Sequence, residues 1–152
     1  MAVAFILTLL GVFTIPVFAL NTIERVSLDS AGAQGNSHSY NPSISGDGRY
    51  VAFYSYASNL VAGDSNGYLD VFVRDRQTNT TTRVSVDSAG AQGNNSSRAS
   101  SISGDGRFVT FQSDATNLVA SDTNGRTDVF VRDRQTNITT RVSIASDGSQ
   151  GN

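Results

Sequence analysis

The sequence predicts an all-β chain built from two repeated four-stranded units, and two observations carry this prediction. The first is a repeat with a step of 58 residues: residues 25–82 and 83–140 align without a gap and are identical at 42 of 58 positions. The second is the hydrophobic period within each unit, which is two residues, as in strands, and never 3.6, as in helices. Repeats of this length are typical of architectures in which neighbouring units must stack to bury their apolar faces.

Each unit is predicted to contain four short strands joined by turns. In the first unit these strands are expected at residues 42–45, 49–55, 70–74 and 80–86. The glycines of Gly46-Asp47-Gly48 suit a tight turn after the first strand, and Asn79 can take the left-handed conformation in a hairpin turn at 77–79. Four antiparallel strands per unit form one blade of a β-propeller.

Differences between the two copies alternate along the second strand. They fall on even positions, whereas Val51 and Phe53 match Val109 and Phe111. The replaced pairs are Tyr50 and Phe108, Ala52 and Thr110, Tyr54 and Gln112, and Tyr56 and Asp114. A pleated strand with two distinct faces produces this alternation. We therefore expect Val51 and Phe53 in the core.

The repeat divides the chain into four parts. Residues 1–20 are uncharged, almost wholly apolar and end in Val17-Phe18-Ala19-Leu20, which predicts a signal peptide or, if uncleaved, a membrane anchor. The chain is accordingly expected to be secreted or periplasmic. Residues 21–40 are expected to form the outer strand of a closing blade plus a link, residues 41–98 a first blade with its link, and residues 99–152 a second blade with its link.

The motifs resemble the TolB-like, WD-repeat-like β-propeller family. They are Ser-x-Asp-Gly-Arg at 45–49 and 103–107, a Val-x-Phe strand, Asp-Val-Phe-Val-Arg-Asp at 70–75 and 128–133, and a Thr-rich strand. The usual proline of the first motif is glycine here, at Gly46 and Gly104. The resemblance covers residues 22–152 and implies a ring of six to eight blades. The two complete blades and closing strand would then be a fragment of a longer propeller, or several copies would assemble to close one ring.

Composition excludes several classes of function. The chain has no cysteine, so disulfides and thiolate sites are ruled out. Its net charge is −2, and its 11 basic residues are scattered arginines, which argues against nucleic-acid binding. The sequence has one histidine, His38, with no cysteine in the chain and no acid close to it in sequence, so no catalytic set is evident.

A short acidic motif occurs once in each copy. Asp-x-Asn-Gly-x-x-Asp places Asp64, Asn66 and Asp70 in the first copy and Asp122, Asn124 and Asp128 in the second. Hard oxygen ligands around a glycine turn are what Ca²⁺ uses, so Ca²⁺ is the one cofactor considered. The alternative is that the Asp and Asn side chains fold a turn by hydrogen bonding to backbone.

Tyrosines and arginines suggest two further surfaces. All five tyrosines lie in the first copy, and Tyr54, Tyr56 and Tyr68 are candidates for a sugar- or peptide-binding platform. The alternative role for these rings is packing against a neighbouring blade. Arg74-Asp75-Arg76, repeated at 132–134, is interpreted as a solvated ion-pair edge.

The leading functional prediction is an exported propeller segment that acts as a protein or peptide interaction scaffold without catalysis of its own. One alternative is a carbohydrate-binding, lectin-like propeller, and another is the propeller part of a larger hydrolase. The expected partner at the loops is a protein, peptide or glycan, with no nucleic acid and with membrane contact only through residues 1–20 if these stay uncleaved.

Overall fold

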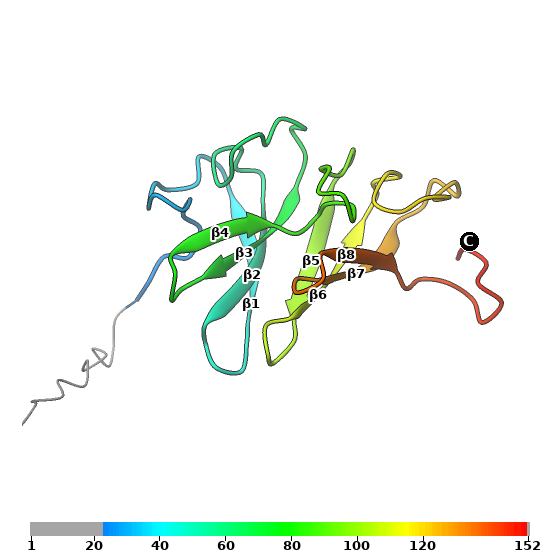
Figure 1. Cartoon of the computed structure of the whole chain (residues 1–152). Coiled ribbons are helices and arrows are strands. Elements are labelled where there is room, and N and C mark those ends of the chain that lie inside the picture. Colours follow the sequence, from blue (N-terminus) through cyan, green and yellow to red (C-terminus); the bar gives the residue numbers. More distant parts are fainter. Residues whose placement is uncertain (1–22, 152) are drawn as a thin grey trace, which may run out of the picture.

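The computed structural model describes residues 23–151, which form two four-stranded antiparallel sheets side by side (Figure 1). The first sheet, blade 1, has the order β1-β2-β3-β4, with strands Ser39–Ile44, Tyr50–Ser55, Asp70–Asp75 and Thr80–Arg83. The second, blade 2, has the order β5-β6-β7-β8, with strands Ser97–Ile102, Phe108–Ser113, Asp128–Asp133 and Ile138–Arg141. The predicted all-β fold of two four-stranded blades is confirmed.

The predicted signal peptide or anchor at 1–20 lies outside the described residues. Within residues 23–151, no helix is long and apolar enough to cross a membrane.

Strand bounds differ from the prediction by more than one residue at two places, each for a local reason. β1 begins at Ser39 instead of residue 42 because a bulge between Tyr40 and Ser43, with Asn41 at φ 45°, lets its pairing with β2 continue. β4 ends at Arg83 instead of residue 86, where the chain turns away from the sheet. The turn predictions are confirmed, since Gly48 has a φ of +72° and Asn79 a φ of 58°.

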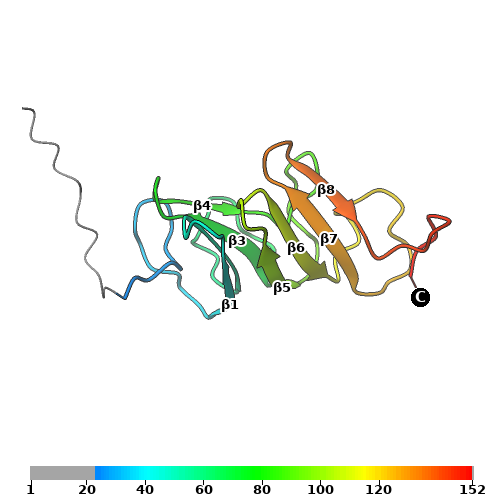
Figure 2. The ribbon, with the colours of Figure 1, turned by 90° about the horizontal axis from the view of Figure 1, so that it is seen from below.

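The main core lies between the two blades. β5 packs against β1 and β2, so the first sheet and the second meet face to face (Figure 2). One side of this core comes from blade 1, with Ala52, Val71, Val73 and Val84; the other comes from blade 2, with Ile102, Val109, Phe111, Ala115, Leu118 and Phe130. A smaller core within blade 1 contains Phe53, Ala57, Leu60 and Phe72. Val51 and Phe53 are buried, as predicted.

The outer strand of a closing blade, expected in the segment before β1, stays a prediction, because the sheet that it would join is not among residues 23–151. Residues 23–27 form no strand, and Leu28 makes only an isolated bridge with Gln34. A strand needs a sheet beside it, and within residues 23–151 no sheet lies on that side of blade 1. Instead, the segment is bound to blade 1: Thr81 Oγ1 donates to Leu28 O at 2.5 Å, and Arg74 Nη1 donates to Asp29 O at 2.9 Å.

The link between the blades is bound to the next blade in the same way. Thr139 Oγ1 donates to Val86 O at 2.6 Å, and Arg132 Nη1 donates to Asp87 O at 2.9 Å.

The interpretation of Arg74 as part of a solvated edge was wrong. Its side chain is buried beneath the preceding link, where it replaces water with carbonyl acceptors. Each blade thus consists of four strands and the link before them.

The glycine that replaces the family's proline has a structural reason in blade 1. Gly46 N donates to Gly104 O across the blade junction at 2.8 Å, and a proline has no N–H with which to make this bond. We expect Gly46→Pro to lower the free energy of unfolding by about 0.5–1.5 kcal/mol, the net contribution of one hydrogen bond between exposed residues. Gly104→Pro is the matched control, because a Cβ at Gly104 meets nothing within 4 Å. Urea denaturation of both variants checks this, and equal losses would contradict it.

Candidate functional site

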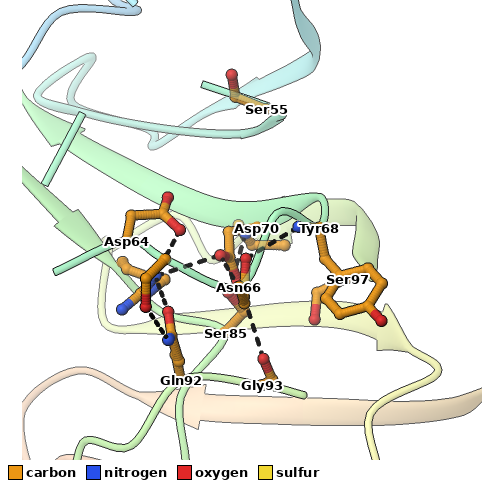
Figure 3. A network of polar contacts seen from close by, with 12 residues as sticks. Ser55, Asp64, Asn66, Tyr68, Asp70, Ser85, Gln92, Gly93 and Ser97 are labelled. Atoms are coloured by element: carbon orange, nitrogen blue, oxygen red, sulfur yellow. Dashed lines mark hydrogen bonds and ion pairs between the residues drawn. The ribbon is translucent and has the colours of Figure 1, made fainter. Parts of the chain in front are cut away.

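The acidic motif of blade 1 lies in a polar network at the loop end of β3 (Figure 3). Asp70, the first residue of β3, is fully buried. Its Oδ1 accepts from Ser85 Oγ at 2.5 Å, and its Oδ2 accepts from Asn66 Nδ2 at 2.9 Å. Asn66 Oδ1 faces away from the carboxylate and accepts from Tyr68 N at 2.9 Å, which closes the Asx turn expected from the motif.

An arginine occupies the centre of this network. Arg83 Nη1 lies 3.1 Å from Asp64 Oδ1, 3.3 Å from Asp70 Oδ2 and 2.8 Å from Gln92 Oε1. Three oxygens of the kind that bind Ca²⁺ therefore converge on a guanidinium nitrogen. The positive charge that compensates the two buried carboxylates is supplied by the chain itself.

Electrostatics distinguishes the two carboxylates. Burial raises the pKa of Asp64, and the nearby charge of Asp70 raises it further, while Arg83 opposes both effects. An acid whose pKa is raised in the fold stabilises the fold fully below its ordinary pKa, and this contribution is lost as pH rises through the raised value. Asp64 is thus the group through which pH acts on this network.

Blade 2 repeats the part of the network that surrounds the arginine. Arg141 Nη1 lies 3.2 Å from Asp122 Oδ1, 3.3 Å from Asp128 Oδ2 and 3.0 Å from Gln150 Oε1. Asn124 Nδ2 donates to Gly151 O, as Asn66 Nδ2 donates to Gly93 O in blade 1. The pKa of Asp122 is likewise raised, first by burial and then by Asp128. The six predicted metal-site residues are therefore gathered into two equivalent networks.

Ca²⁺ binding at these residues stays a prediction, and the position of Arg83 shows what binding would require. Within residues 23–151, no group of three or more His, Cys, Asp or Glu side chains is arranged to hold a metal ion. A bound Ca²⁺ would have to displace Arg83. We expect calorimetric titration with CaCl₂ to give no binding heat, and the melting temperature to be the same in Ca²⁺ and in EDTA. A reproducible rise of the melting temperature in Ca²⁺, abolished by Asp64→Asn, would contradict the arginine-filled arrangement.

An aromatic cluster lies at the loop end of blade 1, close to the blade junction. Tyr40 on β1 is opposite Tyr54 on β2, and their rings stack with centroids 5.5 Å apart. The His38 ring lies 6.1 Å from that of Tyr40. Tyr54 is half-buried and packs against the core between the blades, whereas Tyr40 and Tyr56 are 41% and 49% exposed. Tyr56 is joined to them through its backbone, because Tyr56 N donates to His38 O at 3.1 Å. We call His38, Tyr40, Tyr54 and Tyr56 the aromatic cluster.

Two members of this cluster were missed in the sequence. His38 and Tyr40 lie 14 or more positions before Tyr54, in a stretch interpreted as polar link. Only the bulged pairing of β1 with β2 brings Tyr40 opposite Tyr54. Tyr68, the third predicted ligand residue, is exposed on the loop before β3, and none of the described ring contacts joins it to the cluster. A tyrosine two positions before the predicted start of the first strand was the available signal.

Blade 2 carries an ion pair where blade 1 carries the aromatic cluster. The counterparts of Tyr40 and Tyr56 are Arg98 and Asp114, and Arg98 Nη1 lies 2.7 Å from Asp114 Oδ2. Arg98 and Thr127 together hold the pKa of Asp114 below its ordinary value. The surface at the junction therefore combines exposed aromatic rings from one blade with a half-buried ion pair from the next.

Comparison with known proteins gives similarity in structure only. No family model and no curated protein matches the chain. A protein assigned as TolB from Agrobacterium tumefaciens is similar with a TM-score of 0.48 and 16% identity, over 72% of this chain and 31% of that one. The chain is similar to TolB structures. TolB from Acinetobacter baumannii gives a TM-score of 0.44 and 16% identity, over 74% of this chain and 22% of that one. The chain thus spans less than a third of either protein's length.

Proposed function

We propose that this chain is an exported, non-catalytic propeller module that binds a protein or peptide at the loop end of the junction between its two blades. The aromatic cluster carries the proposal. Its stacked Tyr40 and Tyr54 rings, the exposed Tyr56 and the neighbouring Arg98 are residue types enriched at binding hot spots. A tyrosine ring offers apolar contact area together with a hydroxyl that can hydrogen-bond a partner.

Two features support a binding role without catalysis. The chain has no cysteine and a single histidine, so few side chains are suited to nucleophilic or acid–base chemistry. Several serines and acids near the loops are engaged in structural bonds, as in the pairs Ser85 with Asp70 and Ser97 with Ser113. Export rests on the apolar segment 1–20 and on its small residues before the expected cleavage point.

Selection of peptides from a random phage-displayed library on the purified protein tests this function. We expect enriched peptides whose affinity falls about tenfold or more with Tyr40→Ala and with Tyr56→Ala, as for hot-spot residues. Phe108→Ala is the matched control, since Phe108 is an exposed aromatic residue at the opposite, turn end of blade 2.

A glycan array on the same protein distinguishes the carbohydrate alternative. The peptide proposal expects no glycan signal that depends on Tyr40 or Tyr56. Peptide binding that is equal in all three variants, or specific glycan binding lost in Tyr56→Ala, would overturn it.

A further inference from the structure

The same face of the sheet is buried in blade 1 and exposed in blade 2. In blade 1 the side chains of Val71, Val73 and Val84 are 0%, 1% and 3% exposed, because blade 2 covers them. Their counterparts in blade 2 are also valines, and of these Val129 and Val142 are 36% and 47% exposed. We call this surface, with Phe108, Thr110, Val129, Val131 and Val142, the outer face of blade 2.

Blade 1 shows the complementary difference on its opposite face. Ile102 of blade 2 is buried against blade 1, whereas its counterpart Ile44 is 57% exposed. Ile44 adjoins Val51 on β2, and with Phe53 these residues repeat the identities of Ile102, Val109 and Phe111. We call the surface around Ile44 the outer face of blade 1. In Figure 1 the segment from residue 23 lies beside this blade and the C-terminal segment lies beyond blade 2, so the two outer faces are at opposite ends.

We propose that a second copy of this chain docks the outer face of its blade 1 onto the outer face of blade 2, head to tail. The contact between the two blades within the chain is the template, because the exposed Val129 and Val142 on one side and the exposed Ile44 on the other are the repeat counterparts of residues buried in it, with Val51 and Phe53 already buried beneath Ile44's face. The partner is a second copy, since its Ile44, Val51 and Phe53 are the same residue types as Ile102, Val109 and Phe111, which pack against blade 1 within the chain. This contact is heterologous, so repeating it gives a ring or a filament.

The template also assigns backbone hydrogen bonds to the new contact. Within the chain, Gly46 N donates to Gly104 O at 2.8 Å, and Ser97 N donates to Leu69 O at 2.7 Å. By repeat equivalence, Gly104 N donates to Gly46 O of the second copy, and Thr127 O accepts from Ser39 N of the second copy. These bonds fix the register of the two sheets.

One strand of the outer face makes this contact weaker than the template. β6 carries Thr110 and Gln112 where β2 carries Ala52 and Tyr54. Ala52 is fully buried in the template, so the larger Thr110 must be accommodated at a close-packed position. We expect Thr110→Ala to lower the dissociation constant of self-association.

Two equivalent segments compete for one position in this contact. In the incoming copy this segment is Leu28–Gln34, and in the receiving copy it is Ile144–Gln150. The two segments are 116 residues, or two repeat steps, apart in the sequence, and the end residues of each form an equivalent isolated β-bridge. The incoming segment is tied to its blade by Arg74 and Thr81. The receiving segment is held by Gln150, which bonds Arg141 and Ser121 O. Docking therefore displaces residues 144–150, and truncation after Ser143 should strengthen association.

Sedimentation velocity and light scattering on the whole chain test the proposal. We expect concentration-dependent self-association of the wild-type protein. Val129→Asp and Ile44→Asp should each raise its dissociation constant about tenfold or more, since each places a charge at the centre of one face. Because each variant keeps one face intact, an equimolar mixture of the two should form a dimer and nothing larger. Tyr56→Asp is the control. Tyr56 is exposed and lies outside both faces, and the variant gives blade 1 the aspartate that blade 2 has at the equivalent position, Asp114.

Each possible result decides for or against this contact. Wild-type protein that stays monomeric at its highest soluble concentration would overturn it. So would association lost in Val129→Asp but kept in Ile44→Asp, which would indicate two identical faces packed together, and so would failure of the mixture to dimerise. Circular dichroism checks folding, and Val142→Asp replaces Val129→Asp if the latter unfolds. Tyr56→Asp also separates this contact from the proposed function, because it should lose peptide binding and keep association.

Discussion

Replacing Asp70 by alanine is expected to lower the free energy of unfolding by about 3–5 kcal/mol, the cost of removing one partner from a buried ion pair. The carboxylate is fully buried and accepts from Ser85, Asn66 and Arg83. Its loss leaves the Ser85 hydroxyl without its acceptor, removes one of two acceptors from Asn66 Nδ2, and leaves Arg83 Nη1 with Asp64 and Gln92. A domain of this kind is typically stable by about 5–15 kcal/mol, so the variant should be close to unfolding at room temperature.

Asp70→Asn is the matched control, because it keeps the shape of the side chain and one acceptor oxygen. We expect its loss of stability to lie between those of the wild type and of Asp70→Ala. Urea denaturation followed by circular dichroism measures all three proteins. A loss below about 1 kcal/mol for Asp70→Ala would mean that water satisfies these donors, contrary to the buried network described here.

The raised pKa of Asp64 gives the same network a dependence on pH. Protonated Asp64 is favoured in the folded chain, so its contribution to stability is full below its ordinary pKa and is lost as pH rises through the raised value. Asp75 has the opposite sign: its pair with Arg49 holds its pKa well below the ordinary range, so its contribution is present above that range and is lost on acidification. We expect Asp64→Asn to reduce the loss of stability at higher pH, with the remaining part due to Asp122, and to leave the acid limb unchanged, as measured by melting temperature against pH.

The fold was predictable because its signals are local. The differences between the two repeats alternate along β2, which distinguishes the two faces of the strand. Gly48 and Asn79 take the left-handed conformations that few other residues accept. The start of β1 was not predictable to the residue, because the bulge at Asn41 depends on pairing with a strand that follows it. The predicted fourth strand was too long because Val84 and Val86 are apolar for a different reason: Val84 lies in the core between the blades, and Val86 is buried in the link that follows the strand.

The candidate sites depended on contacts that the sequence does not display. Asp64 and Asp70 form a cation-binding pattern by themselves, and the cation that reaches them is Arg83, on the far side of a hairpin. Arg74 was expected in water because charged neighbours flank it, yet the preceding link covers it. Tyr40 joins Tyr54 only across a strand pair. In each case the residue type was read correctly, and its surroundings came from a segment distant in sequence.

Replacing Gly106 by alanine is expected to cost about 2–4 kcal/mol, well above the cost of the same change at its counterpart Gly48. Both glycines have a left-handed φ, +73° at Gly106 and +72° at Gly48, so both variants share the backbone strain of about 1–2 kcal/mol. Only at Gly106 would the new Cβ lie 2.2 Å from Cδ2 of the Tyr50 ring; at Gly48 the nearest atom is 3.7 Å away.

The Tyr50 ring has little freedom to move away from that Cβ. The Arg134 guanidinium lies 4.2 Å from its centroid, and Arg49 lies 4.7 Å from it. Arg134 also donates to Gly106 O, so the guanidinium that lies over the Tyr50 ring is itself bound to this turn of blade 2. In a Tyr50→Ala background, Gly106→Ala should therefore cost no more than Gly48→Ala does, and the difference between the two backgrounds is the coupling energy across the blade junction. Equal costs at Gly106 in both backgrounds would show that the two blades do not meet at this turn in solution, and the junction on which both proposed surfaces depend would have to be redrawn.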